Sequence, residues 1–511
     1  MRRLFLPVLL LVQLQGSFAQ TDKILDITYN KAITLALQKN FQIKVEEFAP
    51  KIARAQQLTA SGIFDPTVQA SYTYSQSQAV QLATVPGTPD LFLNTTGGVG
   101  SASIFGLTPW GMTYNLGGSS TLSAGSQTQD SYTTFGGLNL TQPLLRGFGT
   151  DVNLAGIRMA RADYSISEWQ LRQQVMDTIT STIFFYNELH FYIGNLAVER
   201  RSRALAEELY KDNQQRESIG VMSKLDVLQP KADVANRENL VLVAERQVLD
   251  NENFLKQLVT DDVSRFLYTH LRIAPPPTMP LDYRIDEPRD LAAALEFRPD
   301  FRQALLDLQK QQINVVFRRN ATLPQLDLIA SLGLNGIDTN LINSATSLTG
   351  ANNYSWTAGA NFSLPIPNRQ ARGLLEQSKL TVLRSLVDLK RLEQDIIARV
   401  DNAAGHVRTT RKRIDATGEA RNLAAETLDA GRVKLNAGTS TTFEVLKFQR
   451  DLATAEIAEI RAIADYNEAV SQYARETGST LQWLGITIEP TPKSLTRQES
   501  KKRNRNDGTV Q

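Results

Sequence analysis

Four segments of the chain alternate between apolar and small polar residues, and this period of two predicts β-strands. They are residues 67–75, 136–141, 326–335 and 354–364. In the last segment every second residue is apolar or aromatic: Tyr354, Trp356, Ala358, Ala360, Phe362 and Leu364. The positions between them are Ser, Thr, Asn and Gly, without a charge. Such strands of about ten residues are typical of a membrane β-barrel, and we favour it over a soluble sandwich because the polar faces hold hardly any Lys or Glu.

Two long proline-free stretches, residues 150–217 and 370–435, predict helices of about 100 Å at a rise of about 1.5 Å per residue. Each is followed by a glycine-containing turn and a second helical stretch. Their apolar positions are interleaved with Ala and Gln on a narrow stripe. This pattern indicates helices that pack side by side as antiparallel coiled coils.

The same order of features occurs twice along the chain. A helix is predicted from residue 29 to about 62 and another from 287 to about 322, each ending before a proline. A β region follows in both halves and ends at Pro143 or Pro365, and the two long helices come after it. The first β region is 36 residues longer than the second (66–143 against 324–365). We expect this insertion, residues 81–130, to lie at the extracellular mouth, with an added hairpin near Tyr114.

The domain organisation follows from this repeat. We expect a signal peptide at 1–19, a first repeat at 20–273, a proline-rich linker at 274–287, a second repeat at 288–490 and a disordered basic tail at 491–511. The signal is indicated by Arg2 and Arg3 before the apolar run Leu4–Leu14, with small residues before a cleavage site after Ala19. No later segment is apolar for long enough to predict a membrane helix.

Composition excludes several kinds of chemistry. The 511 residues contain no cysteine and three histidines, which argues against disulfides, thiolate metal sites and thiol nucleophiles. A formal charge of +2 offers no general attraction to nucleic acid. We find no phosphate-binding loop, zinc-protease helix or serine nucleophile elbow. We therefore predict a protein that is not an enzyme, with no catalytic residues, no cofactor and no dedicated metal site.

Four strands are too few to close a barrel, and an open sheet edge in lipid is very costly. Three copies would supply twelve strands. The sequence therefore predicts an α+β membrane protein: a trimeric 12-stranded β-barrel, four strands per chain, continued by a long antiparallel coiled-coil α-helical barrel, with two internal repeats.

Three motifs carry a family resemblance. They are Ala32–Asn40 (AITLALQKN), Leu140–Gly147 (LTQPLLRG) and Ala294–Asp300 (ALEFRPD). Through them the chain resembles the TolC-like outer-membrane efflux proteins, the outer membrane factor family. The resemblance implies a homotrimer in the outer-membrane lipid of a Gram-negative cell, with its helical tunnel in the periplasm. It also implies a passive exit duct of a tripartite efflux or type I secretion system, opened when a periplasmic adaptor (membrane-fusion) protein and an inner-membrane pump of the RND or ABC type dock.

The resemblance assigns roles to the helix–helix turns. The turns expected to dock on the adaptor consist of Ile219, Gly220, Val221, Ala437, Gly438 and Thr439. The alternative is that their glycines only make the turn. The residues expected at the periplasmic entrance are Asp226, Glu444, Lys447, Leu435 and Ser440.

Threefold symmetry would repeat Glu444 as a negative ring that favours cations. Lys447 stands where some relatives have a second acid, and a pair with Glu444 would partly neutralise the ring. Leu435 and Ser440 replace the tyrosine and arginine of the family's constricting network. We therefore expect a less cation-selective entrance, held shut by fewer polar contacts.

A second hypothesis is a periplasmic coiled-coil scaffold or adaptor without a pore. Salt or carbonate would release such a scaffold, whereas a barrel would require detergent. A third keeps the fold but assigns it to protein secretion or metal efflux. The cargo itself leaves no signal in the sequence, because the pump selects what enters the duct.

Overall fold

The structure is a computed structural model that describes residues 23–81, 91–125, 128–266, 269–277, 285–350 and 353–487. The predicted signal peptide and basic tail lie outside these residues. The chain divides into two compact units. Unit 1 consists of the described parts of Met1–Lys44, Gln174–Ala292 and Arg399–Ile486, and unit 2 of those of Val45–Gln173, Ala293–Ala398 and Thr487–Gln511. Each unit therefore combines segments from both predicted repeats.

The two helices that open the predicted repeats are each interrupted. The first is divided into α1 (Tyr29–Lys39), α2 (Phe41–Glu46) and α3 (Phe48–Ser61), followed by the 3-10 turn η1 (Gly62–Phe64). The second is divided into α8 (Glu287–Phe297) and α9 (Pro299–Ala321). Our prediction of continuous helices was wrong at these points. The Asn40 side chain accepts hydrogen bonds from the backbone of Gln42 and Ile43 and so starts a new helix, and Pro299 occupies the first turn of α9.

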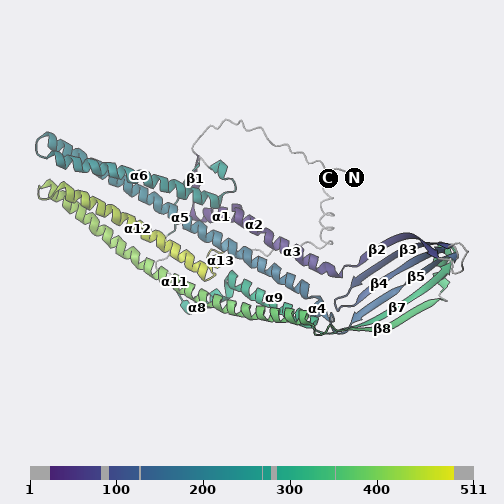
Figure 1. Ribbon diagram of the computed structural model, residues 1–511. Coiled ribbons are helices and arrows are strands. Elements are labelled where there is room, and N and C mark those ends of the chain that lie inside the picture. Colours follow the sequence, from purple (N-terminus) through teal and green to yellow (C-terminus); the bar gives the residue numbers. More distant parts are fainter. Residues whose placement is uncertain are drawn as a thin grey trace, which may run out of the picture. The chain divides into compact units, whose positions relative to one another are not determined.

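The long helices are confirmed, and they form two hairpins (Figure 1). The first hairpin joins α5 (Ala155–Ser218) to α6 (Lys224–Val259), and the second joins α11 (Arg369–Asn436) to α12 (Thr442–Glu476). The longer arms contain 64 and 68 residues. Their length is therefore about 100 Å, at a rise of about 1.5 Å per residue. The short helices α4 (Thr150–Asn153), α7 (Val263–Phe266) and α13 (Thr480–Trp483) flank these arms in sequence. No helix in the described ranges is long and apolar enough to cross a membrane.

A six-stranded antiparallel sheet forms the β part, in the order β2-β3-β4-β5-β7-β8 (Figure 1). Its strands are β2 (Thr67–Gln81), β3 (Leu91–Leu107), β4 (Thr113–Gly125), β5 (Thr128–Pro143), β7 (Gln325–Asp338) and β8 (Tyr354–Ser363). The four predicted strands are all present in it as β2, β5, β7 and β8. The predicted count of four strands per chain was wrong, because the insertion contributes β3 and β4. Glycine and serine are frequent on both faces of β3, so the alternation that marks the other strands is weak there.

The register of the sheet separates two faces. One row that crosses four neighbouring strands is apolar throughout: Leu116, Leu138, Leu332 and Trp356. The adjacent row is polar throughout: Asn115, Asn139, Ser331 and Thr357. In the single chain these apolar side chains are exposed or partly exposed, and Trp356 is 68% exposed. The sheet therefore presents a large uncovered apolar face, which a monomer in water would not tolerate.

Two smaller features were not predicted. A parallel pair of strands, β1 (Lys23–Ile27) and β6 (Thr269–Ile273), joins segments far apart in sequence. The Tyr186 hydroxyl donates at 2.7 Å to the carbonyl of Ala274, just beyond that pair. Between β7 and β8, the short helix α10 (Leu341–Thr346) and the 3-10 turn η2 (Ser347–Gly350) lie against the sheet, where the buried Ser344 hydroxyl donates to the carbonyl of Tyr132 at 2.9 Å.

Candidate functional site: the tips of the two helical hairpins

The turn of the first hairpin is closed by a pair of backbone hydrogen bonds. The N–H of Gly220 donates to the carbonyl of Glu217 at 2.8 Å, and the N–H of Val221 donates to that of Arg216 at 3.0 Å. Gly220 has a φ of 81°. This value lies in the left-handed region, which glycine tolerates best. The geometry is a Schellman motif, which satisfies the last carbonyls of α5 within the chain.

The second turn repeats this construction. The N–H of Gly438, at φ 74°, donates to the carbonyl of Leu435 at 3.1 Å, and that of Thr439 donates to the carbonyl of Lys434 at 2.9 Å. Local hydrogen bonding therefore accounts for the backbone of both predicted docking turns. The side chains of Ile219 and Val221 take no part in these hydrogen bonds, whereas the Thr439 hydroxyl donates to the carbonyl of Lys434 at 3.2 Å.

A pair of glycine substitutions separates backbone strain from crowding in these turns. A Cβ at Gly438 or at Gly405, within α11, would meet no atom within 4 Å. We expect Gly438→Ala to destabilise the second hairpin by about 1–2 kcal/mol, because only this position of the two has a left-handed backbone. The matched change Gly405→Ala should instead stabilise the helix by about 0.5–1 kcal/mol. Thermal unfolding of the two variants measures both effects, and equal shifts would contradict the assignment.

Each hairpin returns through a capped helix start. Ser223 and Asp226 form a reciprocal capping box at α6, and Thr441 and Glu444 form one at α12. The Ser440 hydroxyl also donates to the carboxylate of Glu444 at 2.6 Å. That hydrogen bond is the main cause of a lowered pKa for Glu444, which is exposed to solvent and stays ionised.

The predicted entrance residues are therefore distributed over different environments. Asp226 and Glu444 are engaged in capping boxes, one on each hairpin. Lys447 adds to the lowering of the Glu444 pKa through its charge. In the part of the chain that the structure describes, no ion pair joins Lys447 to Glu444. The carboxylate of Glu444 instead accepts hydrogen bonds from the Ser440 hydroxyl and, at 3.4 Å, from the backbone N–H of Thr441. The expected Lys447–Glu444 pair is thus absent from the described part of the single chain.

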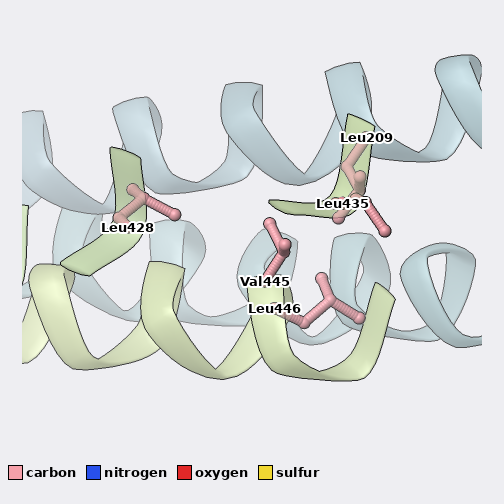
Figure 2. Packing of buried hydrophobic residues seen from close by; sticks show 5 residues of the cluster. All are labelled: Leu209, Leu428, Leu435, Val445 and Leu446. Atoms are coloured by element: carbon pink, nitrogen blue, oxygen red, sulfur yellow. The ribbon is translucent and has the colours of Figure 1, made fainter. Parts of the chain in front are cut away.

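Leu435 lies inside the hairpins. It packs in a cluster with Leu209 of α5, Leu428 of α11, and Val445 and Leu446 of α12 (Figure 2). Only 9% of Leu435 is exposed. In this chain the residue holds the two hairpins together close to their tips, which is a packing role that the family resemblance did not assign to it.

Polar contacts also join the two tips. The Asn213 side-chain amide donates to the carbonyl of Asp226 at 2.8 Å and to the hydroxyl of Thr442, on the other hairpin, at 3.1 Å. Arg216 donates to the side chain of Asn436 at 2.9 Å. Sequence reasoning missed these residues, because a buried Asn or a terminal Arg in a long helix resembles an ordinary solvated position.

The tips differ in what they expose. The first presents two large apolar side chains, Ile219 and Val221, which are 73% and 71% exposed. The second presents the small exposed residues Ala437 and Thr439 on either side of its glycine. Neither apolar side chain is needed for the turn, since the hydrogen bonds there involve only the backbone. An exposed apolar pair at a hairpin end is a surface on which another protein can dock.

A cluster of charges lies further along the second hairpin and was not predicted. The guanidinium of Arg461, on α12, contacts three carboxylates: Glu188 at 2.5 Å, Asp465 at 2.6 Å and Glu468 at 3.3 Å. All four side chains are mostly buried. Burial raises the pKa of Glu468 to about 8, although Arg461 opposes that rise. Arg461 thus bridges three acids that would otherwise repel one another, and Arg413 of α11 forms a second ion pair with Asp465 at 2.8 Å.

The described residues contain no group of three or more His, Asp or Glu side chains placed to hold a metal ion. The histidines His190 and His406, which lie within α5 and α11, belong to no such group. Within the described ranges, the site is therefore a pair of capped hairpin ends, and the turn of the first exposes two apolar side chains.

Comparison with known proteins places these features in a family context. A family model described as "Outer membrane efflux protein" matches residues 32–260 and 291–479. Outer membrane protein TolC of Escherichia coli (strain K12) is 22% identical over 367 residues, which cover 64% of this chain and 69% of TolC.

Solved structures show the same fold. The CmeC outer membrane channel of Campylobacter jejuni matches 93% of this chain and 88% of its own, with a TM-score of 0.65 and 18% identity. The outer membrane protein VceC of Vibrio cholerae matches 88% of this chain and 96% of its own, with a TM-score of 0.65 and 16% identity. Matches of this extent include both the helical hairpins and the sheet.

Proposed function

Because the chain belongs to the outer membrane efflux protein family, we propose that three copies form a passive channel that serves as the exit duct of a tripartite efflux or type I secretion system. The protein is an outer-membrane protein whose helical part extends into the periplasm. The observation that carries the proposal is the two-faced sheet, with one uncovered apolar face and one face on which Ser, Thr, Asn and Gly predominate. The apolar face contacts lipid, and the polar face lines water.

The height of the apolar face supports this assignment. On β7, every second residue from Leu326 to Leu334 is apolar. These residues extend over about 26 Å along the strand. With the tilt usual in membrane barrels this becomes about 18–21 Å, against an apolar band of about 25 Å. Aromatic residues lie toward both ends of the neighbouring β8, with Tyr354 and Trp356 at one end and Phe362 at the other.

The hairpin tips are the part of the duct that binds a partner protein. The exposed Ile219 and Val221 form the docking surface for a periplasmic adaptor protein, and the adaptor connects the duct to an inner-membrane pump. The sequence contains no recognisable nucleotide-binding motif, so the pump supplies the energy. The entrance residues Asp226, Glu444, Lys447 and Ser440 lie beside the tips and line the periplasmic entrance, while Leu435 packs behind them.

Extraction and conductance test the channel against the alternative of a periplasmic scaffold. We expect the protein to stay in membranes washed with carbonate and to need detergent for release. Native mass spectrometry of the released protein should give the mass of a trimer. The trimer should give conducting events in planar lipid bilayers, because the polar face of the sheet encloses water. Release by carbonate together with the absence of conductance would favour the scaffold.

The entrance should be only weakly selective for cations. We expect Glu444→Gln to change the cation-to-anion permeability ratio by less than about twofold, because an exposed charge is screened by salt. The carboxylate also lies near the charges of Lys434 and Lys447. Reversal potentials across a salt gradient measure the ratio. Glu419→Gln, an exposed acid on α11 away from the tip, is the control. A strong cation selectivity that Glu444→Gln abolishes would show instead that Glu444 dominates the entrance.

A further inference from the structure

The two outer strands of the sheet lack a partner on one side. β2 pairs only with β3, and β8 pairs only with β7, among the strands of the described chain. Their outer edges therefore offer rows of backbone donors and acceptors, and such edges are not tolerated within lipid. The pore of the proposed channel is incomplete until these edges are covered.

A second copy of the chain fits these edges in direction and in side-chain orientation. Neighbouring strands are antiparallel throughout the order of six, so β8 of one copy runs antiparallel to β2 of the next. The faces also agree. Residues with even numbers lie on the apolar face of both strands, as Tyr72 and Tyr74 do in β2 and as Trp356 and Phe362 do in β8. If even-numbered residues of β8 lie opposite even-numbered residues of β2 in the next copy, the apolar face and the polar face both continue from one copy to the next.

The register within one chain gives the tilt of the strands. One row of partners crosses the whole sheet: Thr67, Phe105, Asn115, Asn139, Ser331 and Thr357. Ser363, the last residue of β8, lies six residues beyond this row. If Ser363 lies opposite Thr67 of the partner subunit, the register shifts by six residues of about 3.3 Å each along the strands. This shift accumulates over six strand spacings of about 4.8 Å each. The resulting tilt is about 35°, within the range of membrane barrels.

We propose that three copies close an 18-stranded barrel, with β8 of each copy paired antiparallel to β2 of the next and Ser363 opposite Thr67 of the partner subunit. This inference rests on the trimer of the proposed function and changes its expected strand number from twelve to eighteen. In that register Phe362 lies opposite Val68 of the partner subunit, and Trp356 lies opposite Tyr74 of the partner subunit. Apolar side chains thus meet apolar side chains along the lipid face.

Eighteen strands would also widen the pore. At equal tilt, 18 strands give a barrel about 1.5 times as wide as 12 strands, and barrels of about 16 to 18 strands leave an aqueous channel. The added strands β3 and β4 bring polar-face residues of the same kind as the other strands, among them Ser101, Ser103, Asn115 and Ser119. The insertion therefore widens the outer end of the duct instead of covering it.

Disulfide trapping tests the junction, because the chain has no cysteine of its own. The pair Thr73→Cys and Thr357→Cys should form bridges between copies and give a covalent trimer in oxidised membranes. The control pair Ser77→Cys and Thr357→Cys is four residues out of register, about 13 Å along the strand, and should remain unbridged. Equal bridging by both pairs would overturn the proposed register.

A second pair of measurements tests the strand number. Ser71 and Ser101 are partners in β2 and β3, with hydroxyl oxygens 2.8 Å apart, and Ser71→Cys with Ser101→Cys should bridge within one chain. In a 12-stranded barrel that left out β3 and β4, β2 would lie against β5. Thr73→Cys with Thr133→Cys would then bridge, although two strands separate these residues in the sheet described here.

The outcomes distinguish the strand number from the channel itself. Suppose that bridges form between copies and that Thr73→Cys also bridges to Thr133→Cys. This result would support the trimeric channel but contradict the 18-stranded barrel. Bridges only within one chain, with no covalent trimer and no conductance, would overturn the channel. A strand count from electron cryomicroscopy of the purified trimer gives an independent answer, and twelve strands in the wall would refute the inference.

Discussion

Two acidic substitutions at the first hairpin tip, Ile219→Asp and Val221→Asp together, are expected to abolish efflux while the trimer still assembles. Both side chains are exposed and take no part in the hydrogen bonds of the turn, so the hairpin should tolerate the change. A charge on an apolar docking surface costs about 2–4 kcal/mol of binding, or roughly a 30-fold to 1,000-fold loss of affinity. Susceptibility to an exported toxic compound should rise to that of cells lacking the channel.

Two control variants show whether the effect belongs to docking. The exchange Ile219→Val with Val221→Ile keeps the tip apolar and should leave efflux within about twofold of the original. Ala437→Asp with Thr439→Asp adds the same charges to the second tip and reports whether that tip contacts the adaptor as well. Trimer yield and conductance should be unchanged in all three. Full efflux by the double variant Ile219→Asp with Val221→Asp, with adaptor capture intact, would contradict a docking role for the first tip.

Removing the cation of the buried charge cluster is expected to produce the largest loss of stability. Arg461→Met removes the guanidinium that contacts Glu188, Asp465 and Glu468, while Asp465 keeps its ion pair with Arg413. Breaking a buried ion pair from one side costs about 3–5 kcal/mol. The melting temperature of the detergent-solubilised protein should fall accordingly.

A matched arginine at the surface provides the control for this loss. Arg246 pairs with Asp250, and its side chain is 72% exposed. Arg246→Met should cost less than about 1 kcal/mol, because exposed ion pairs contribute little. Equal shifts of the melting temperature in Arg246→Met and Arg461→Met would contradict a special role for the buried cluster.

The same cluster predicts how stability depends on pH. The pKa of Glu468 is raised to about 8 in the folded chain, so the folded chain holds a proton that the unfolded chain releases near pH 4.5. The stability linked to this proton is fully present below about pH 4.5 and is lost as the pH rises through about 8. Glu468→Gln should therefore raise the melting temperature at about pH 8.5 more than at about pH 5.5. An equal effect at both values would show that Glu468 is ionised in the folded state.

The loss caused by Arg461→Met should have the same pH dependence. Glu468 holds its proton at about pH 5.5 and then repels Glu188 and Asp465 less, so the variant should lose less stability at about pH 5.5 than at about pH 8.5. An effect independent of pH would indicate that Arg461 acts through packing, for example against the ring of Phe191, whose centroid is 5.0 Å from its guanidinium.

The long helices, their glycine turns and four of the six strands were predictable from local signals. A proline-free helix of many turns, or a strand with apolar residues at every second position, carries its own pattern. The turns at Gly220 and Gly438 were also found, because a glycine between two helical stretches marks a left-handed backbone position. The family resemblance was likewise contained in short contiguous motifs.

The roles of individual side chains were harder to predict. Leu435 was expected at the entrance, but it packs against Leu209 and Val445 from two other helices. Glu444 was expected to pair with Lys447, but it caps its own helix and accepts a hydrogen bond from Ser440. The charge cluster around Arg461 could not be predicted, because its partner Glu188 lies 273 positions away in the sequence. Such contacts depend on which helix faces come together.

By itself, the sequence determined what neighbouring residues can encode: the extent of the helices, the position of the turns, the two faces of a strand and the membership of a family. Only the tertiary structure decided that β3 and β4 join the sheet, that the second hairpin packs on the first near Leu435, and that three acids share one arginine. The physical reason is that local patterns fix backbone conformation and side-chain direction, whereas strand number and buried charge pairs depend on contacts between segments far apart in the chain.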